Sequence, residues 1–354
     1  MNIFLTGGTG FLGTQLIQQL LDSNHHVYVL ARSLKKSREL LDKIPVHLHS
    51  KIEIIEGNLS SNTLGMSVED HARLHGKIDV FYHIAALLSF DFKKSEELYQ
   101  SNQIGTKHTL EFAKSIGVKS YYYISTAYTL GKKDRADEIL HPIDQEFNNS
   151  YEETKCKAEY LVMSYSESMK VAIFRPSIIV GHSVTGRTDS MFGLYGFLKG
   201  IEVFKKKMAK VESNRNKTFT IIGNPYGTQN LVPVDYVCKV LMAGLEHATN
   251  QTIYHITNPH PPINHEGFQV IKSVLDLPNI EFDLIDSGKL SKEEVLLNSF
   301  ISNFSIYINR NIDFTITNTT MLLDTVNEKV LDMNEEMFKT IISGYKNERT
   351  AVLQ

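Results

Sequence analysis

A glycine-rich stretch near the amino terminus constrains the fold of this chain more than any other feature. Residues 6–13 read Thr-Gly-Gly-Thr-Gly-Phe-Leu-Gly, after a short apolar run and before an amphipathic run at helical spacing. A strand, a tight glycine turn and a helix in succession can hold a dinucleotide, because the free helix amides meet the pyrophosphate charge. The stretch therefore predicts a dinucleotide site with contributions from Gly7, Thr9, Gly10, Phe11 and Leu12.

Apolar runs typical of strands alternate with helical patterns through the first half of the chain. The predicted strands are Ile3 to Thr6, Val27 to Ala31, Ile52 to Glu56, Val80 to Ile84, Tyr121 to Ser125 and Val171 to Phe174. Helical patterns lie between them, for example at Leu16 to Leu21, Ser95 to Ser115 and Glu152 to Tyr165. This alternation predicts an α/β protein of the Rossmann type. Its doubly wound parallel sheet is covered on both faces and binds ligands at the carboxyl ends of the strands.

A second domain is expected where the alternation breaks. The pattern stops after Gly181, returns for a helical run at Asn230 to His247 and a strand at Thr252 to Ile256, and ends at Pro259. We therefore expect a dinucleotide-binding domain of residues 1–181 and 228–258, and a smaller, discontinuous substrate-binding domain of residues 182–227 and 259–354. The aromatic stripe from Met191 to Phe204 is more often core, but it is also a candidate wall for an apolar substrate.

The composition argues against several classes of function. The chain has 37 Lys and Arg against 40 Asp and Glu, so bulk binding to nucleic acid or to anionic membranes is not expected. No leader and no apolar run of roughly eighteen residues is seen, so no integral membrane segment is expected. Two cysteines, Cys156 and Cys238, suit a reducing compartment, and we expect a soluble, cytoplasmic protein. The histidine pairs His47 with His49 and His71 with His75 lack a cysteine or carboxylate frame, so no metal site is expected.

A basic run follows the second predicted strand, where ribose specificity is usually set. A site that prefers NAD has an acidic residue there, whereas this chain offers Arg32, Ser33, Lys36 and Arg38. Cations and a hydroxyl suit a 2′-phosphate, so NADP is the favoured cofactor. A solvated basic face at a helix start is the alternative interpretation.

Hydroxyls and a lysine follow the fourth and fifth strands. Ala85 and Ala86 end the fourth strand with small residues that let an adenosine lie flat, and Thr126 follows the fifth. Tyr151 and Lys155 lie four residues apart on a predicted helix, so the ammonium group is near the phenol and favours the phenolate. This arrangement would make a group with a reference pKa of about 10 useful near neutrality.

In their combined order, these elements resemble the extended short-chain dehydrogenase/reductase family over most of residues 1–260. The resemblance implies that Thr126, with Ser125 beside it, holds the substrate oxygen and that Tyr151 transfers the proton. It further implies that Lys155 lowers the tyrosine pKa and grips the nicotinamide ribose. Asn102 matches the asparagine of the helix before the catalytic strand.

The resemblance also implies cofactor contacts outside the glycine turn. Asn58 and Leu59 stand where the family commonly has Asp-Leu against the adenine, and the Asn58 amide can still make that contact. Pro176 and Ile178, in the segment Phe174 to Gly181, are implied to contact the cofactor as well.

Later segments favour one branch of the family. Phe174 to Gly181 lacks the Arg-x-Phe-Asn and Tyr-Gly-Pro elements usual in nucleotide-sugar epimerases and dehydratases. Leu231 to Val237 is similar to the Val-Pro-Val-Asp segment of the thioester-reductase and fatty acyl-CoA reductase branch, the male-sterility type, and Phe314 to Asn318 fits it loosely. This branch implies NADPH-dependent reduction of an acyl thioester, on coenzyme A or a carrier, or of a fatty aldehyde.

Two other classes of function stay open at this point. One is a nucleotide-sugar epimerase or dehydratase, or a hydroxysteroid-type alcohol dehydrogenase, in which the same residues oxidise an alcohol. The other is a non-catalytic NADP-sensing protein. The sensing function is disfavoured because Thr126, Tyr151 and Lys155 are all present, and a sensor needs no proton donor.

Overall fold

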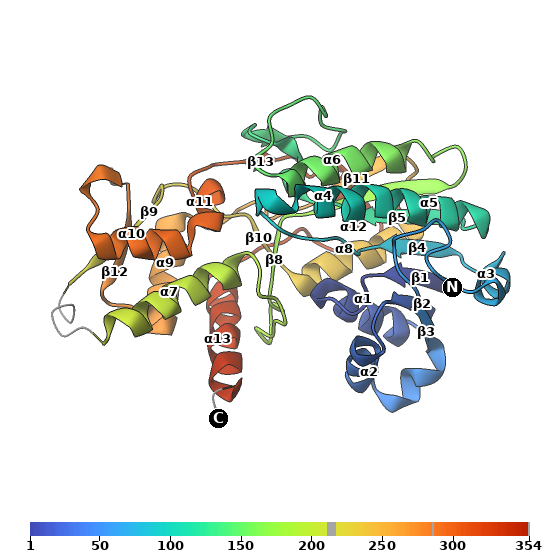
Figure 1. Ribbon diagram of the computed structural model, residues 1–354, viewed down its shortest axis with the longest axis horizontal. Helices are drawn as coiled ribbons and strands as arrows, with labels where there is room; N and C mark the ends of the chain where they lie inside the picture. Colours follow the sequence, from blue (N-terminus) through green and yellow to red (C-terminus); the bar gives the residue numbers. More distant parts are fainter. Residues whose placement is uncertain (211–216, 285–286, 353–354) are drawn as a thin grey trace. The chain divides into compact units, whose positions relative to one another are not determined.

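The computed structural model describes residues 1–210, 217–284 and 287–352, which form two compact units (Figure 1). The first unit comprises Met1–Ser177, Tyr236–Thr257 and Phe314–Val330. The second comprises the described residues of Ile178–Asp235, Asn258–Asp313 and Leu331–Gln354. The second unit is therefore discontinuous in sequence.

The first unit is built on a seven-stranded sheet in the order β11-β7-β5-β4-β1-β2-β3, with every pairing parallel. The strands are β1 (Asn2–Thr6), β2 (His26–Ala31), β3 (Ile52–Glu56), β4 (Val80–His83), β5 (Ser120–Ile124), β7 (Lys170–Pro176) and β11 (Thr252–Ile256). The helices are α1 (Phe11–Asp22), α2 (Leu34–Asp42), α3 (Val68–Leu74), α4 (Ser95–Leu98), α5 (Gly105–Ser115), α6 (Ser150–Met163), α8 (Val234–His247) and α12 (Thr317–Asp324). The predicted doubly wound α/β fold is confirmed.

Helices pack on both faces of this sheet. On one face, α5 and α6 contribute apolar residues to a core cluster that also holds the β5 residues Tyr121 and Tyr123. On the other face, the Tyr82 hydroxyl donates to the Leu241 carbonyl of α8 at 2.7 Å, and Gly244 of α8 packs against the Phe174 ring. Because the strands are buried on both faces, their sequences are nearly continuous apolar runs, and each predicted strand starts within one residue of the observed one.

One secondary-structure prediction is wrong in detail. The run Asn230 to His247 was expected to be helical throughout, but Leu231–Pro233 forms strand β10, parallel to β8 (Ile178–Val180), and α8 begins only at Val234. Pro233 has no amide hydrogen to donate, so it suits the end of a strand directly before a helix.

The segment Phe314–Val330 belongs to the first unit, whereas the sequence assigned it to the substrate-binding domain. The physical reason is a half-buried carboxylate, Glu138, that the sequence did not single out. Glu138 accepts hydrogen bonds from the Asn318 amide and from the Thr319 hydroxyl, the latter at 2.9 Å, and also from the His255 amide at 2.8 Å. These bonds hold the segment beside β11.

The second unit has its own core, made by helices and two short parallel strand pairs. Its remaining elements are α7 (Leu194–Met208), β9 (Phe219–Ile222), α9 (Asn264–Leu275), β12 (Ile280–Asp283), α10 (Lys292–Phe300), α11 (Ser302–Ile308) and α13 (Glu335–Val352). Strand β9 pairs with β12, and a short strand β13 (Asp313–Phe314) pairs with β6 (Arg135–Ala136). The aromatic stripe lies largely in this core, with Tyr195, Phe197 and Phe204 buried, whereas Met191 and Phe192 are exposed. Within the described residues, no helix is both long and apolar enough to cross a bilayer.

Candidate active site

The glycine turn joins β1 to α1 as the sequence predicted. Gly7 has a φ of +78°, and a Cβ there would lie 2.6 Å from the Ala85 amide nitrogen. A Cβ on Gly13 would overlap the Gly7 carbonyl oxygen, so both positions require glycine for close packing. Gly10 caps α1 without a side-chain hydrogen bond, and no acidic residue occupies the first helical turn. The amides at this helix end therefore have no side-chain anion competing for them.

A cavity of about 690 Å³ opens beside this turn. A volume of this order lies within the range of small-molecule sites. The cavity is lined by most of the predicted cofactor residues, namely Gly7, Thr9, Gly10, Phe11, Leu12, Arg32, Asn58, Leu59, Ala85 and Ala86. Glycines, small side chains and a helix start around this cavity fit a dinucleotide.

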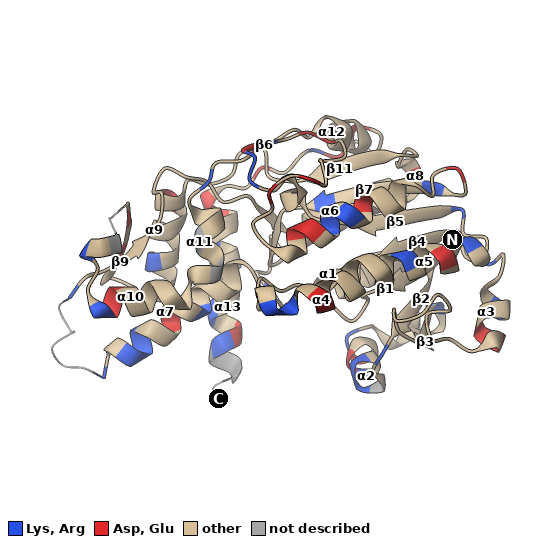
Figure 2. Cartoon of the chain, turned by 45° about the horizontal axis from the view of Figure 1, so that its top comes forward, with Lys and Arg blue, Asp and Glu red and all other residues tan. Residues whose placement is uncertain are grey.

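The residues of the basic run lie in two different environments. Arg32 is exposed and lines the cavity, whereas Ser33 and Lys36 are absent from its lining. Ser33 caps α2 instead, because its hydroxyl oxygen accepts from the Lys36 amide at 3.4 Å. Figure 2 shows the Lys and Arg positions of α2 in blue along the helix ribbon. Of the predicted 2′-phosphate ligands, Arg32 is thus the one that faces the cavity.

Helix α6 carries Tyr151 and Lys155 on one face. Asn149 starts the helix by accepting from the Glu152 amide at 3.0 Å, so Tyr151 lies in the first turn. Lys155 is 1% exposed, and its ammonium group donates to the Ile124 carbonyl at the end of β5 at 2.6 Å. The same ammonium group lies 4.1 Å from the centre of the Tyr123 ring. The lysine is therefore held at the carboxyl end of β5.

The electrostatics of this pair differ from the expectation in one respect. Burial raises the pKa of Tyr151, and the neighbouring Glu152 carboxylate raises it further. Any lowering of that pKa by Lys155 does not offset these two effects, since the pKa of Tyr151 stays above its ordinary value. Burial lowers the pKa of Lys155 to about 7, and Glu159 opposes this shift. Tyr151 is therefore a neutral phenol, the form that can donate a proton.

Three buried hydroxyls stand at the carboxyl ends of adjacent strands. Ser125 follows β5, Ser177 follows β7 and Thr257 follows β11, each less than 7% exposed. Within the described part of the chain, none of these hydroxyl oxygens has a hydrogen-bond partner. Thr126, beside Ser125, caps a short helix by accepting from the Tyr128 amide at 3.3 Å. Buried polar atoms without partners at one sheet edge fit a site that hydrogen-bonds a ligand.

Asn102 ties together the segments that flank the site. Its side chain accepts from the Leu87 amide at 2.7 Å and donates to the Leu87 carbonyl at 2.9 Å. It also donates to the Thr154 hydroxyl on α6 at 3.4 Å. Asn102 lies in a π-helical stretch, Tyr99–Ile104, and such stretches occur often at functional sites. The predicted asparagine thus joins the end of β4 to the helix that carries Tyr151.

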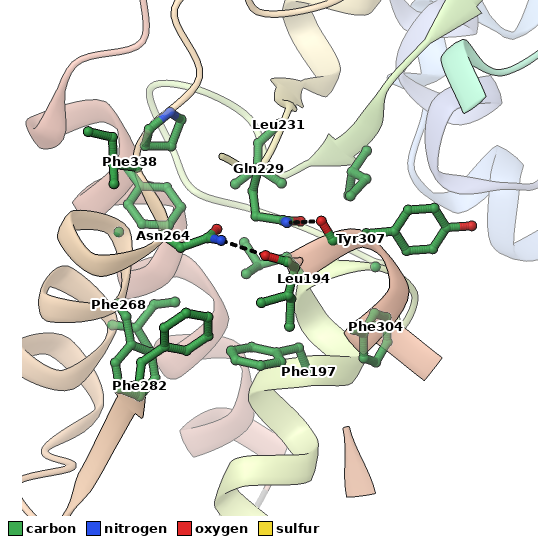
Figure 3. A pocket seen from close by; sticks show the side chains of 17 residues that line it. Leu194, Phe197, Gln229, Leu231, Asn264, Phe268, Phe282, Phe304, Tyr307 and Phe338 are labelled. Atoms are coloured by element: carbon green, nitrogen blue, oxygen red, sulfur yellow. Dashed lines mark hydrogen bonds between the residues drawn. The ribbon is translucent and has the colours of Figure 1, made fainter. Parts of the chain in front are cut away.

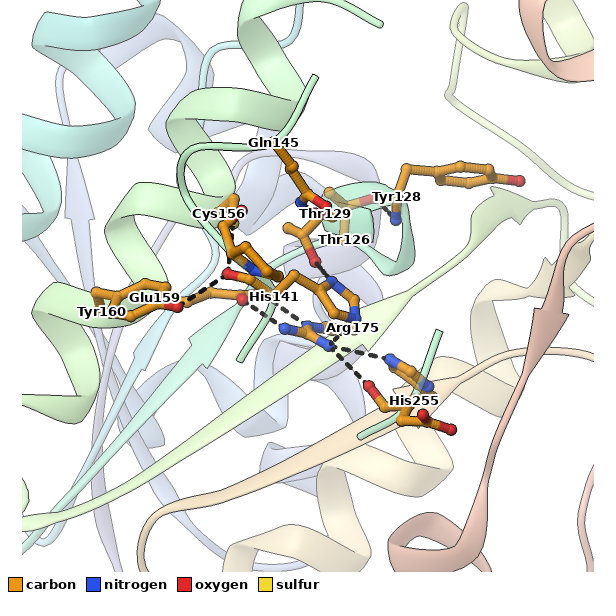
Figure 4. A network of polar contacts seen from close by, with 12 residues as sticks. Thr126, Tyr128, Thr129, His141, Gln145, Cys156, Glu159, Tyr160, Arg175 and His255 are labelled. Atoms are coloured by element: carbon orange, nitrogen blue, oxygen red, sulfur yellow. Dashed lines mark hydrogen bonds and ion pairs between the residues drawn. The ribbon is translucent and has the colours of Figure 1, made fainter. Parts of the chain in front are cut away.

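A second polar cluster centres on Arg175 (Figure 4). Its guanidinium group and the Glu159 carboxylate form a two-pronged pair at 2.8 and 2.6 Å, and both side chains are fully buried. The Nε2 atoms of His141 and His255 lie 3.4 and 3.2 Å from Arg175 Nη1. Burial and Arg175 lower the pKa of His141 to about 3 and that of His255 well below its usual value. Both histidines are therefore neutral and accept from the arginine.

The sequence analysis did not single out Glu138, His141, Glu159 or His255. For Glu159 a signal was present, because Tyr151, Lys155 and Glu159 continue one helical face at spacings of four residues. The histidines and Glu138 gave no comparable signal, since their partners are far away in sequence. The structure places the predicted Pro176 at the buried end of β7, and Ile178 lines a cavity of the second unit.

Curated proteins with similar sequences include fatty acyl-CoA reductases. The fatty acyl-CoA reductase wat of Drosophila melanogaster is 28% identical over 288 residues, covering 68% of this chain and 53% of that protein. Fatty acyl-CoA reductase 2 of Homo sapiens is 24% identical over 332 residues, covering 78% of this chain and 62% of that protein. The chain spans about half the length of the fly proteins that it matches.

Solved structures with the same fold cover nearly the whole chain. The terminal R domain from the myxalamid PKS-NRPS biosynthetic pathway has a TM-score of 0.77 at 23% identity, covering 99% of this chain and 90% of that one. A thiolation-reductase di-domain from an archaeal non-ribosomal peptide synthetase has a TM-score of 0.77 at 19% identity, covering 99% and 76%. A UDP-glucuronic acid 4-epimerase from Bacillus cereus, in complex with NAD, has a TM-score of 0.71 at 18% identity, covering 99% and 98%. At these identities the likenesses show the fold alone.

The family is decided by a direct match of the sequence. The sequence model described as "Male sterility protein" matches residues 5–241, well over half of the chain. This match includes the glycine turn, the Tyr151 and Lys155 pair and the segment around Asp235. The chain therefore belongs to the male sterility protein family.

Proposed function

We propose that this chain is an NADPH-dependent oxidoreductase that reduces an acyl thioester, carried by coenzyme A or by a carrier protein, or a fatty aldehyde. The observation that carries the proposal is Tyr151, a neutral phenol on the helix that also places Lys155 at the carboxyl end of β5. Membership of the family supports it, as do the names of the similar fatty acyl-CoA reductases.

The cavity residues would hold the cofactor. The amides at the start of α1 would meet the pyrophosphate, Arg32 would meet a 2′-phosphate, and Asn58 and Leu59 would contact the adenine. Ser33 and Lys36 would contact the 2′-phosphate beside Arg32 only if their side chains changed conformation, because Ser33 caps the start of α2. Lys155 would bind the nicotinamide ribose, and Pro176 and Ile178 would border the nicotinamide. When bound, the reduced nicotinamide supplies the hydride for the carbonyl carbon.

Proton transfer and positioning then fall to the protein's own residues. The Tyr151 hydroxyl donates its proton to the substrate oxygen as that oxygen gains charge. Lys155, with a pKa near 7 and Glu159 one turn away, stabilises the phenolate that forms. Thr126 accepts from a backbone amide, so its own hydroxyl hydrogen can be donated to the same substrate oxygen.

The reaction balances as follows for a thioester. The carbonyl carbon gains a hydride and the oxygen gains the Tyr151 proton, which gives a hemithioacetal. The carbon–sulfur bond then breaks, and an aldehyde and a free thiol are released. An aldehyde substrate gains the same hydride and proton and gives an alcohol.

The compartment and the carrier are part of the proposal. Cys156 and Cys238 are both buried, and neither forms a disulfide bond, which suits the reducing cytoplasm. A carrier-bound substrate is supported by the thiolation-reductase di-domain, in which a reductase of this fold is joined to a thiolation domain. Either carrier presents the same acyl thioester to the site.

The test is a substrate panel. The protein is incubated with NADPH and, in separate reactions, acyl-CoA esters, a carrier-bound acyl thioester, fatty aldehydes and nucleotide sugars. We expect loss of the reduced nicotinamide absorbance with the acyl substrates, together with free thiol from the thioesters. Conversion of a nucleotide sugar without net NADPH loss, and no reaction of any acyl substrate, would contradict the proposal.

A further inference from the structure

The second unit contains an apolar cavity of its own (Figure 3). It has a volume of about 70 Å³ and lies among α7, α9, β12, α11 and α13. Aromatic and aliphatic side chains form its walls, including Leu194, Phe197, Phe268, Phe282, Phe304 and Phe338. A space of this lining favours an apolar occupant over a polar one.

The polar side chains of Gln229 and Asn264 in the lining form hydrogen bonds with backbone carbonyls. The Gln229 side chain donates to the Tyr307 carbonyl at 2.8 Å, and the Asn264 side chain donates to the carbonyls of Ile308 and Asn224, both at 2.8 Å. These bonds secure the end of α11, and Figure 3 shows the Tyr307 hydroxyl pointing away from the cavity. A sugar or nucleotide in this space would leave its hydroxyls unpaired, which is costly.

Gly267 keeps the cavity open from within α9. It is buried in the helix interior, where glycine is destabilising relative to alanine. A Cβ on Gly267 would meet the Phe338 ring at 3.5 Å, which is ordinary contact, so alanine would fit. Packing therefore does not require this glycine. What a side chain at position 267 would change is the free space of the cavity.

Strand β8 contributes to the cavity wall through Ile178. Ile178, which lines the cavity, directly follows Ser177, whose buried hydroxyl has no partner in the described part of the chain. Ile178 also pairs with Leu231, a second wall residue, in the β8–β10 ladder. The β8–β10 ladder thus contributes two residues to the apolar wall.

We propose that this cavity binds the apolar end of the acyl chain and that Gly267 sets the longest chain it accepts. The inference rests on the proposed function, because it assumes an acyl substrate. The occupant is a linear, uncharged hydrocarbon chain. A larger side chain at position 267 fills the same space and shortens the accepted chain.

The test compares Gly267→Val, Gly267→Ala and Ser273→Ala with the unmodified protein. Ser273 is exposed on the same helix, so its replacement by alanine also favours the helix but leaves the cavity unchanged. Binding of saturated acyl-CoA esters of increasing length is measured by calorimetry, and NADPH oxidation is measured separately. Affinity should rise up to roughly fourfold per methylene until the cavity is full.

Gly267→Val should end this rise roughly two methylenes earlier, with Gly267→Ala in between and Ser273→Ala unchanged. Gly267→Ala keeps the test decisive if the valine variant fails to fold. An unchanged chain-length profile in the folded Gly267 variants, with normal NADPH oxidation, would overturn the cavity assignment and leave the proposed function standing. A chain-length profile that shifts as expected without any NADPH oxidation would support the cavity and contradict the proposed function instead.

Discussion

The two units hold cavities of opposite character. The cavity of the first unit is bounded by backbone amides, glycines and a basic residue, and a row of buried hydroxyls stands at the carboxyl ends of neighbouring strands. The cavity of the second unit is bounded by aromatic rings, and its amide side chains are engaged with backbone carbonyls. Ligand binding in the first cavity should depend on individual polar atoms, whereas ligand binding in the second should depend on the shape of the apolar space. Substitutions that change one polar atom at constant shape should therefore act strongly in the first unit.

The largest effect is expected from Glu159→Gln. It leaves the Arg175 guanidinium fully buried without its carboxylate, and breaking such a pair costs on the order of 3 to 5 kcal/mol of unfolding free energy. Denaturant unfolding measures this loss. Glu153→Gln is the matched control, because Glu153 pairs with Lys157 on the exposed side of the same helix and should cost under about 1 kcal/mol. Equal losses of unfolding free energy in the two variants would contradict a larger contribution from the buried Glu159–Arg175 pair.

The next effect is on turnover. Tyr151→Phe keeps the ring and removes the proton donor, so turnover should fall roughly a hundredfold or more with nearly unchanged NADPH affinity. Steady-state kinetics and a cofactor titration measure both. Tyr165→Phe makes the same chemical change outside the site and should retain normal turnover. Near-normal turnover of Tyr151→Phe would remove this residue from the mechanism.

Cofactor choice should depend mainly on one charge. Arg32→Ala should weaken NADPH binding by about 1.5 to 3 kcal/mol and NADH binding much less, because a charge-assisted contact to the 2′-phosphate is lost. Arg38→Ala is the control, since Arg38 is exposed on α2 but does not line the cavity. Titrations of both cofactors decide the matter, and equal losses for NADPH and NADH would sink the assignment.

The last effect concerns pH and is the smallest when expressed per pH unit. His141 is neutral in the fold, with a pKa lowered to about 3, while its unfolded pKa is about 6.5. The unfolded state then binds the extra proton first, so the contribution of His141 to stability is complete above pH 6.5 and is lost as the pH falls toward 3. His141→Gln should reduce the slope of unfolding free energy against pH by about 1.4 kcal/mol per pH unit in that window. Exposed His75→Gln should not, and an unchanged slope for His141→Gln would contradict the neutral assignment.

The contrast between the units also explains what could be predicted from sequence. The sheet, the glycine turn and the pair Tyr151 and Lys155 follow from local patterns, because strand, turn and helix are consecutive in the chain. Glu138 and His255 were not predicted from the sequence because their partners, Thr319 and Arg175, come from distant segments. The apolar cavity was not predicted for the same reason. Its lining residues are spread over the sequence from Ile178 to Phe338, and each one alone resembles an ordinary core residue.

The pKa of Tyr151 could not be predicted from spacing. Four residues on a helix place Lys155 near the phenol, but only the structure shows that the ammonium group donates to the Ile124 carbonyl. Burial then dominates, and the phenol stays protonated. A protonated phenol is the form that a proton donor requires.

The central claim is hydride transfer to an acyl carbon, and isotope transfer tests it most directly. The protein is given an acyl-CoA ester and NADPH that carries deuterium at the transferable position, and the product is analysed by mass spectrometry. We expect an aldehyde, or the alcohol derived from it, with deuterium on the former thioester carbon and free thiol equal in amount to the thioester reduced. A product without deuterium, or hydrolysis to the free acid with NADPH untouched, would contradict it.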